Sequence, residues 1–287
     1  MNRGLKTFNV INTIFLALVS LVTLLPFLIV LSVSFSDERS IAKYGYSIIP
    51  KQLSLAAYKG LFGAGSTIFN AYKVTVFITV VGTLLAVLIT SMMGYALSRK
   101  QLKYKNFFNM LVYIPMVFSG GLVPFYIVLL KLHLSNNIWG LIVPMLFNPF
   151  NLFLIRNFFK GLPDSIMESA KIDGAGEFRI FWSIVLRLAL PGLGTITLFY
   201  ALAFWNDWTL ALLLIDDTRL YPLQYLLRQI LSRVTFVATS GAHVTGNIPA
   251  ESTKMATVIV TIGPIVLVYP FIQKYFIKGI TIGAIKG

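Results

Sequence analysis

Residues 161–190 read GLPDSIMESAKIDGAGEFRIFWSIVLRLAL and separate two long apolar runs of the chain. This stretch is too polar to cross a membrane. Pro163 suits the first turn of a helix, and Asp164 complements the positive end of the helix dipole. We therefore expect a short helix from about Pro163 to Ile172, which the following glycine-containing sequence GAG ends.

A second helix is expected from about Glu177. Its large apolar side chains recur at spacings of three and four and so predict one stripe along the helix: Phe178, Phe181, Trp182 and Val185. The segment is thus a helix, a tight turn and an amphipathic helix. Taken alone, this pattern also fits a helix pair that lies on the inner leaflet of a membrane.

Long apolar segments lie on both sides of this stretch. A helix needs about 20 apolar residues to cross the hydrocarbon of a membrane, and it satisfies its own backbone hydrogen bonds there. Six segments qualify, at about residues 10–35, 74–97, 107–130, 138–158, 188–215 and 255–276. We predict an all-α integral membrane protein, with residues 1–287 as a single transmembrane domain and residues 161–187 as a loop.

The composition agrees with a membrane environment. The chain is 57% hydrophobic and only 12% charged, whereas about 25% of the residues of a soluble domain are charged. The net charge is +14, but Lys and Arg lie mainly between the apolar runs. Their expected partners are therefore anionic lipid headgroups and not nucleic acid. The first apolar stretch, roughly 24 residues long, exceeds the apolar region of a signal peptide and is expected to remain as the first span.

The positive charges also predict the orientation of the chain. Arg99, Lys100, Lys103 and Lys105 crowd the second loop, whereas the short third loop offers only Lys131. Because positive loops stay in the cytoplasm, we expect both termini and residues 161–187 on the cytoplasmic side of a multi-pass protein.

One ordered set of residues in this loop points to a family. Nine positions match the EAA signature in order and spacing: Glu168, Ser169, Ala170, Asp173, Gly174, Ala175, Phe178, Ile184 and Pro191. The chain resembles the permease subunits of binding-protein-dependent type I ABC importers for carbohydrates. Two departures are Ser169 in place of alanine and Arg187 where sugar permeases often carry proline.

The resemblance implies a fold, a place in the cell and a set of partners. The expected fold has six transmembrane helices and a cytoplasmic EAA coupling loop that docks on an ATPase. Glu168 would pair with a basic group of that ATPase, while Ala170 and Gly174 permit close approach. The implied partners are a homologous second permease, two cytoplasmic ABC ATPase subunits and an extracytoplasmic solute-binding protein, all at a bacterial cell membrane. The implied substrate is a carbohydrate. The overall resemblance favours an oligosaccharide, and acidic oligosaccharides belong to the expected class.

The C-terminal sequence QKYFIKGITIGAIKG resembles the tail of maltose-type permeases. This resemblance implies that the tail, residues 277–287, reaches the ATPase through four residues: Lys278, Gly279, Gly283 and Lys286. Without the EAA signature, a basic tail of this kind would indicate only membrane anchoring.

No catalytic chemistry is expected in this chain. The nucleotide-binding pattern G-x-x-x-x-G-K-[ST] does not occur, so ATP and Mg²⁺ would bind the partner ATPase. His133 and His243 are far apart and lack acidic partners at the spacing of a metal site. We therefore expect no catalytic residue, metal or cofactor here.

Polar residues within the apolar segments are candidates for a substrate path, because they are costly in a membrane. One group is the sequence FWNDW, with Trp205, Asn206, Asp207 and Trp208. Either the two Trp belong to the interfacial aromatic belt with Asp207 solvated, or they stack on sugar rings while Asn206 and Asp207 bind hydroxyls, as a similar patch in sugar permeases implies.

Asn148 and Asn151, on either side of Pro149, are a second candidate group, and packing between helices is the alternative role. The segment from Tyr221 to Arg233 predicts an amphipathic helix outside the membrane that helps to receive the binding protein.

A secondary transporter or channel without an ATPase is the alternative function. It would require internal symmetry or carboxylates within the membrane for ion coupling. The central parts of the spans contain no carboxylate, and Asp207 is the nearest one.

Overall fold

The computed structural model describes residues 3–63, 67–239 and 250–266. These residues form helices and turns, without a strand among them and with one isolated bridge between Ser36 and Leu53. The predicted all-α class is confirmed. The helices are α1 (Arg3–Ser34), α2 (Glu38–Tyr44), α3 (Ala56–Phe62), α4 (Ile68–Ser98), α5 (Lys105–Val117), α6 (Leu122–Lys131), η1 (Ile138–Leu141), η2 (Val143–Met145), α7 (Pro149–Lys160), α8 (Asp164–Ile172), α9 (Glu177–Ile180), η3 (Phe181–Val185), α10 (Leu186–Leu188), α11 (Leu190–Asn206), α12 (Thr209–Leu214), η4 (Thr218–Leu220) and α13 (Leu223–Thr239). Residues 250–266 are also helical.

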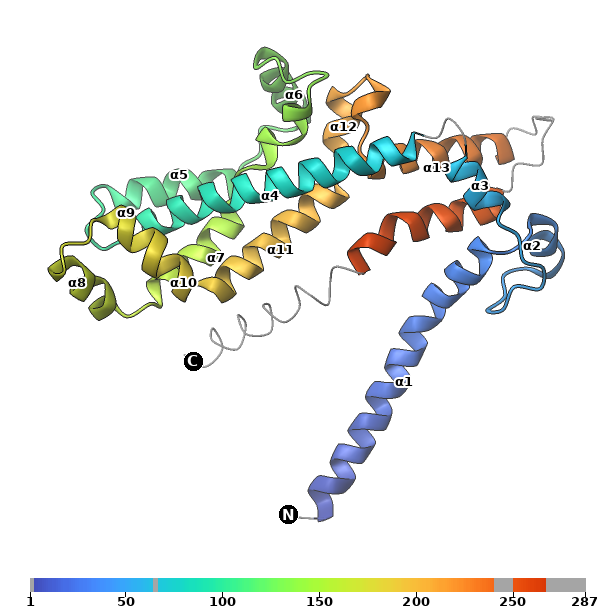
Figure 1. Ribbon diagram of the computed structural model, residues 1–287, viewed down its shortest axis with the longest axis horizontal. Helices are drawn as coiled ribbons and strands as arrows, with labels where there is room; N and C mark the ends of the chain where they lie inside the picture. Colours follow the sequence, from blue (N-terminus) through green and yellow to red (C-terminus); the bar gives the residue numbers. More distant parts are fainter. Residues whose placement is uncertain (1–2, 64–66, 240–249, 267–287) are drawn as a thin grey trace. The chain divides into compact units, whose positions relative to one another are not determined.

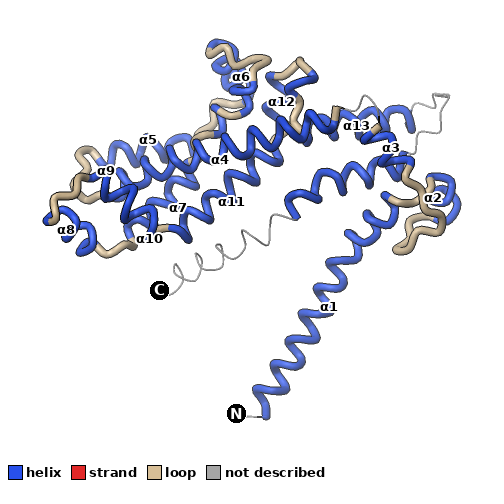
Figure 2. The backbone as a smooth tube through the Cα atoms, viewed as in Figure 1, coloured by secondary structure: helices blue, strands red, loops and turns tan. Residues whose placement is uncertain are grey.

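Figure 2 shows the described backbone as helices joined by loops and turns. The helices fall into two compact units. The first unit comprises residues 1–69 and 227–266. The second comprises residues 70–226. The coupling loop predicted from the sequence belongs to the second unit.

In the first unit, α1 is the expected first apolar helix. Its stretch Phe8–Ser34 is apolar along 27 residues, and the protein buries none of its most apolar window. A helix of this length and composition matches the thickness of a membrane. At the other end of the unit, the carboxylate of Glu38 accepts hydrogen bonds from the backbone amides of Glu251 (2.9 Å) and Ser252 (3.2 Å). These bonds satisfy amides that the start of helix 250–266 leaves without helical partners.

The long helix α4 supports the second unit, where α7 packs against both α5 and α11 (Figure 1). The predicted segment 74–97 lies within α4. Gly82 of α4 faces Phe204 of α11, and a Cβ at Gly82 would lie 2.6 Å from the phenyl ring. The two helices approach this closely because position 82 carries no side chain.

The other apolar segments of this unit are broken by sharp bends. The helix axes turn by 118° between α5 and α6, by 50° between η1–η2 and α7, and by 83° between α9–α10 and α11. Within the described residues, two helices are long and apolar enough to cross a membrane, and up to five spans result if each bent pair is one span. The sixth segment expected, residues 255–276, lies only partly within the described residues.

Local sequence explains each bend. Gly121, between α5 and α6, has a φ of 85°, which glycine adopts readily. Asn148 accepts a hydrogen bond from the backbone amide of Asn151 (3.1 Å) and so caps α7 directly after the 3-10 turns. The bend before α11 lies at Ala189, and Pro191 stands in the first turn of α11. The bend therefore forms although Arg187 occupies the position where sugar permeases often carry proline.

Candidate functional site

Helix α8 is the first element of the coupling loop. It runs from Asp164 to Ile172, as the sequence predicted, and Gly174 follows it with a φ of 79°. The amide of Ala175 donates to the carbonyl of Ala170 (2.9 Å), and the amide of Gly174 donates to that of Lys171 (3.0 Å). These two bonds form a Schellman motif, in which a left-handed glycine ends the helix. Gly174 is thus required by the backbone itself.

The two faces of α8 have different surroundings. Met167 and Ala170 are buried in a cluster that also contains Tyr95 of α4 and Phe181 of η3. Glu168, Ser169 and Asp173 are exposed, and the side chain of Ile172 is 87% exposed. The buried face attaches α8 to the helical core, while the other face carries an acidic residue and an uncovered isoleucine. The sequence analysis did not single out Ile172, although its position next to Asp173 and Gly174 was a signal for it.

The second helix of the loop differs from the prediction in one respect. Residues Phe181–Val185 form a π-helical turn between α9 and α10, in which the amide of Leu186 donates to the carbonyl of Phe181, five residues earlier. Phe181 and Val185 are buried, whereas Phe178 is 70% and Trp182 44% exposed. The prediction of a single apolar stripe is therefore wrong. The wider π-helical turn and the contact with α4 place Phe181 and Val185 on a buried face and leave Phe178 and Trp182 on an exposed one. Ala175 is half-buried.

Glu177 links three elements of the second unit. Its carboxylate lies 2.6 Å from the ammonium of Lys171 on α8 and 3.6 Å from the guanidinium of Arg99 at the end of α4. The hydroxyl of Tyr95 on α4 donates a hydrogen bond to the same carboxylate. The sequence analysis placed Glu177 only at the start of a helix, since the partners on α4 lie far away in the chain.

A second pair joins the loop after α4 to the start of α8. The ammonium of Lys100 lies 2.7 Å from the carboxylate of Asp164. Two effects of Lys100 hold the pKa of Asp164 below its usual value: first its hydrogen bond to the carboxylate, and second its positive charge. Both side chains are largely exposed, so the solvent screens this pair and its effect on stability is small.

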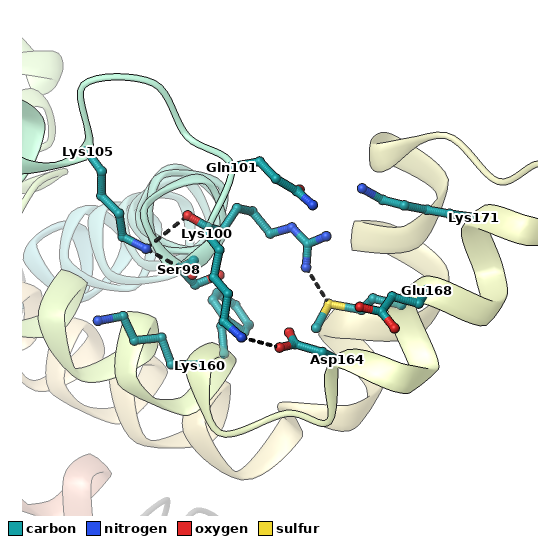
Figure 3. A pocket seen from close by; sticks show the side chains of 11 residues that line it. Ser98, Lys100, Gln101, Lys105, Lys160, Asp164, Glu168 and Lys171 are labelled. Carbon is teal, nitrogen blue, oxygen red and sulfur yellow. Dashed lines mark hydrogen bonds and ion pairs between the residues drawn. The ribbon is translucent and has the colours of Figure 1, made fainter.

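Two cavities flank this loop. The first, of about 450 Å³, lies between the ends of α4 and α7 and helix α8, and charged side chains dominate its wall (Figure 3). The second, of about 400 Å³, is more apolar and is lined by Tyr95, Arg99, Glu177 and Phe178 among others. Arg99 borders both cavities.

The sequence FWNDW lies where α11 ends and α12 begins. The carboxylate of Asp207 accepts a hydrogen bond from the amide of Leu210 (3.2 Å), close to the first turn of α12. Asn206 is exposed and donates to the carbonyl of Leu202 (2.8 Å). Trp205 and Trp208 are half-buried. Asp207 thus stabilises a helix start, whichever of its two predicted roles applies.

The tertiary structure adds Gln224 of α13 to this group, because its side-chain amide donates to the side-chain oxygen of Asn206 (3.3 Å). The predicted amphipathic segment Tyr221–Arg233 is helical from Leu223 onward. The sequence analysis did not predict the contact between Gln224 and Asn206, because a polar residue in an amphipathic helix does not indicate a distant partner.

Asn148 and Asn151 lie at the start of α7, where Asn148 is exposed and Asn151 is buried. The amide of Asn148 donates to the hydroxyl of Tyr200 (3.0 Å), and this hydroxyl is also hydrogen-bonded to Thr90 (2.7 Å). The arrangement joins α4, α7 and α11 through the buried Tyr200, which the sequence analysis did not single out.

The tail residues Lys278, Gly279, Gly283 and Lys286 lie outside the described residues. Within the described part of the chain, no group of three or more His, Cys, Asp and Glu residues is arranged to hold a metal ion.

Comparison with known proteins identifies the family. A family model described as "binding-protein-dependent transport system inner membrane component" matches residues 3–282. Protein LplC of Bacillus subtilis is 43% identical over 98% of this chain and 96% of its own length. The polygalacturonan/rhamnogalacturonan transport system permease YtcP of the same species is 39% identical, over 98% of this chain and 99% of that protein. An arabinooligosaccharide transport permease, AraQ of Halalkalibacterium halodurans, is 30% identical over 96% of this chain and 95% of its own length.

A solved structure agrees with these relatives. It is a bacterial ABC transporter involved in the import of the acidic polysaccharide alginate, one chain of which superposes with a TM-score of 0.84 at 29% identity. The match covers 96% of this chain and 99% of that one. The resemblance to importer permeases, first seen in the EAA signature, is confirmed. This chain belongs to the family of inner membrane components of binding-protein-dependent transport systems.

Proposed function

We propose that this chain is one permease half of an ATP-driven importer that moves acidic oligosaccharides from an extracytoplasmic binding protein into the cytoplasm. Two similar proteins support the substrate class, because YtcP is named for polygalacturonan and rhamnogalacturonan transport and the solved transporter for alginate import. The family match over residues 3–282 is the observation that carries the proposal.

The complex would contain a homologous second permease, two ABC ATPase subunits and the binding protein, in a bacterial cell membrane with both termini of this chain in the cytoplasm. ATP and Mg²⁺ would bind the ATPases, and this chain would catalyse no reaction. Residues 277–287 would add a further contact with the ATPase through their lysines and glycines.

The coupling loop supplies the mechanical connection in this proposal. The exposed face of α8, with Glu168 and Ile172, would dock on the ATPase, with Glu168 facing a basic group. Its buried face would carry the movement into the core through Met167 and Ala170, and Glu177 would carry it into α4. These contacts connect a docking surface to α4, which runs the length of the second unit.

The substrate path would pass the polar group at the end of α11. Trp205 and Trp208 would stack on sugar rings, while Asn206 and Gln224, which already share a hydrogen bond, offer amide groups to hydroxyls or carboxylates. Asn148 and Asn151 would line the path further along, at the start of α7.

Uptake by reconstituted complexes tests this proposal. Proteoliposomes would contain this chain, the second permease and the ATPases, with the binding protein outside, and would receive labelled oligogalacturonides or arabino-oligosaccharides of equal length. We expect uptake of the acidic substrate that requires both ATP and the binding protein. A preference for the neutral sugar would overturn the acidic class, and uptake driven by an ion gradient without ATP would favour the secondary transporter.

A further inference from the structure

The charged cavity beside α8 has an excess of cations. Its wall of five basic and two acidic side chains comes from the end of α4, the loop before α5, the end of α7 and helix α8 (Figure 3). The basic residues are Arg99, Lys100, Lys105, Lys160 and Lys171, and the acidic residues are Asp164 and Glu168. A cavity of about 450 Å³ lies within the size range of small-molecule sites.

Most of these cations already have partners. Lys100 pairs with Asp164, and Lys171 pairs with Glu177. The ammonium of Lys105 donates to the carbonyl of Ser98 (3.3 Å), the last residue of α4, and to that of Arg99 (2.9 Å), the residue after it, and so lies at the negative end of that helix. Two bonds leave one of the three N–H groups of Lys105 free to bind a ligand.

Lys160 is different. Among the described residues it forms no ion pair, and neither cavity carboxylate lies within ion-pair distance of it. Its charged neighbours are the cations Lys105 and Arg156. Arg156, one turn earlier on α7, is bonded to the neutral side chain of Asn109 (2.5 Å), and its buried Nε atom has no partner. Arg156 lies outside the cavity wall, whereas Lys105 and Lys160 both line it. Neither of these two lysines forms an ion pair with Asp164 or Glu168, and their positive charges repel one another, so an anion bound beside them would be stabilised.

An apolar surface borders this group of cations. Helix α5 starts at Lys105, and its next turns expose Phe107, Phe108 and Leu111. A free anion would use only the cations, whereas a phospholipid would place its phosphate in the cavity and its acyl chains along α5. Basic pockets between helices at the cytoplasmic membrane surface bind anionic headgroups in this way.

We propose that this cavity binds the phosphate headgroup of an anionic phospholipid, with Lys160 and Lys105 as its contacts. The proposal depends on the proposed function only in assigning this face to the cytoplasmic leaflet. Because α8 forms one wall of the cavity, the bound lipid would hold the coupling helix against α4 and α7.

Lipid retention by the purified complex tests the site. The complex is delipidated in neutral detergent, supplied with equal amounts of phosphatidylglycerol and phosphatidylcholine, and analysed by native mass spectrometry. We expect selective retention of phosphatidylglycerol, reduced about fivefold by Lys160→Gln, which is the effect of one lysine near an anionic surface. Lys160→Arg should retain the lipid, since it preserves the charge.

Lys103→Gln is the matched control. Lys103 is an exposed lysine of the loop between α4 and α5, lies over the ring of Tyr104 and does not line the cavity. Equal losses in Lys103→Gln and Lys160→Gln would indicate a diffuse charge effect and overturn the proposal. Equal retention of the two lipids by the unaltered complex would also overturn it.

A second arm separates a lipid from a free anion. Excess inorganic phosphate is added to the lipid-free complex, and the shift of its unfolding temperature is compared between the unaltered protein and Lys160→Gln. We expect no difference. A phosphate-induced shift that depends on Lys160 and equals the shift with phosphatidylglycerol would assign the cavity to a free anion instead. Neither arm measures uptake, so a failed import experiment would leave these results interpretable.

Discussion

Gly174 shows how one backbone angle decides where α8 ends. Its positive φ places the residue in the left-handed region, and nothing lies within 4 Å of the position of a Cβ atom. The sequence analysis expected the GAG sequence to end this helix and gave Gly174 a second role in close approach by a partner. The Schellman motif shows how Gly174 ends the helix. A side chain here would strain the backbone even without a clash.

Gly174→Ser should therefore weaken the end of α8 by about 1 kcal/mol, the lower end of the cost of a left-handed non-glycine residue. Hydrogen exchange of the amides of α8 would be about fivefold faster. Gly176→Ser is the control, because Gly176 has a φ of −72°, equally open surroundings and a helix N-cap position that serine favours. Unchanged exchange in the Gly174 variant would contradict the role of the backbone angle.

Gly82 is needed because a side chain at this position would clash with Phe204, and not because of its backbone conformation. Gly82→Ala would place a methyl group 2.6 Å from the ring of Phe204 and should lower stability by about 1–3 kcal/mol through overpacking. Thermal unfolding of the purified protein measures this loss. Gly263→Ala, at a helical glycine with nothing within 4 Å, should leave the unfolding temperature unchanged or raise it. A combined Gly82→Ala and Phe204→Leu variant should regain part of the loss.

At the scale of elements, ion pairs and buried side chains together hold α8 against α4. Met167 and Ala170 supply the apolar contact, and Glu177 supplies a carboxylate shared by Lys171, Arg99 and Tyr95. Half of the Glu177 side chain is exposed, so this network contributes less than a buried one would. Its value lies in holding the orientation of α8, through which a docking force would be transmitted.

Glu177→Gln should keep the fold but loosen α8, because the neutral amide no longer attracts Lys171 and Arg99. We expect faster hydrogen exchange over residues 164–172 and fewer sugar molecules transported per ATP hydrolysed, with the ATPase still bound. Asp164→Asn, which removes the exposed pair with Lys100 and one negative charge at the start of α8, should change both quantities less. Equal effects in both variants would contradict a special role for Glu177.

At the scale of the whole molecule, the chain is a part of a larger assembly. Its second unit exposes an uncovered isoleucine on the helix that we propose as the ATPase contact. Most of the binding energy of a protein interface comes from a few residues. Ile172 can act as one of them because its side chain does not pack in the core of this chain. The bent helices of the same unit expose further apolar residues that the membrane or the second permease would cover.

Ile172→Asp should reduce co-purification of the ATPase about tenfold, the range expected for one interface residue of moderate weight. The amount of chain in the membrane should stay the same, because the side chain is 87% exposed. Ile49→Asp is the control, since Ile49 is 77% exposed and belongs to the first unit, whereas the coupling loop belongs to the second. Normal ATPase binding in Ile172→Asp would contradict docking through this face of α8.

The sequence by itself determined the all-α class, the family and the bounds of α8. These properties depend on local patterns: apolar segments of membrane length, a proline and an aspartate that start a helix, and a glycine that ends it. An ordered signature of nine residues added the family, because chance rarely reproduces such spacing. Local patterns were insufficient for α9 to α10, where the π-helical turn and the contact with α4 divided the predicted stripe.

Only the tertiary structure decided how the loop is held and what lies beside it. Tyr95 and Glu177 are separated by 82 positions, and Lys100 and Asp164 by 64, so no helical or strand period relates them. The bends that bring α4, α7 and α8 together also gather Lys105 and Lys160 around one cavity. Such groups form through packing between distant segments, and the energies that select them depend on distances that a linear pattern of residues does not contain.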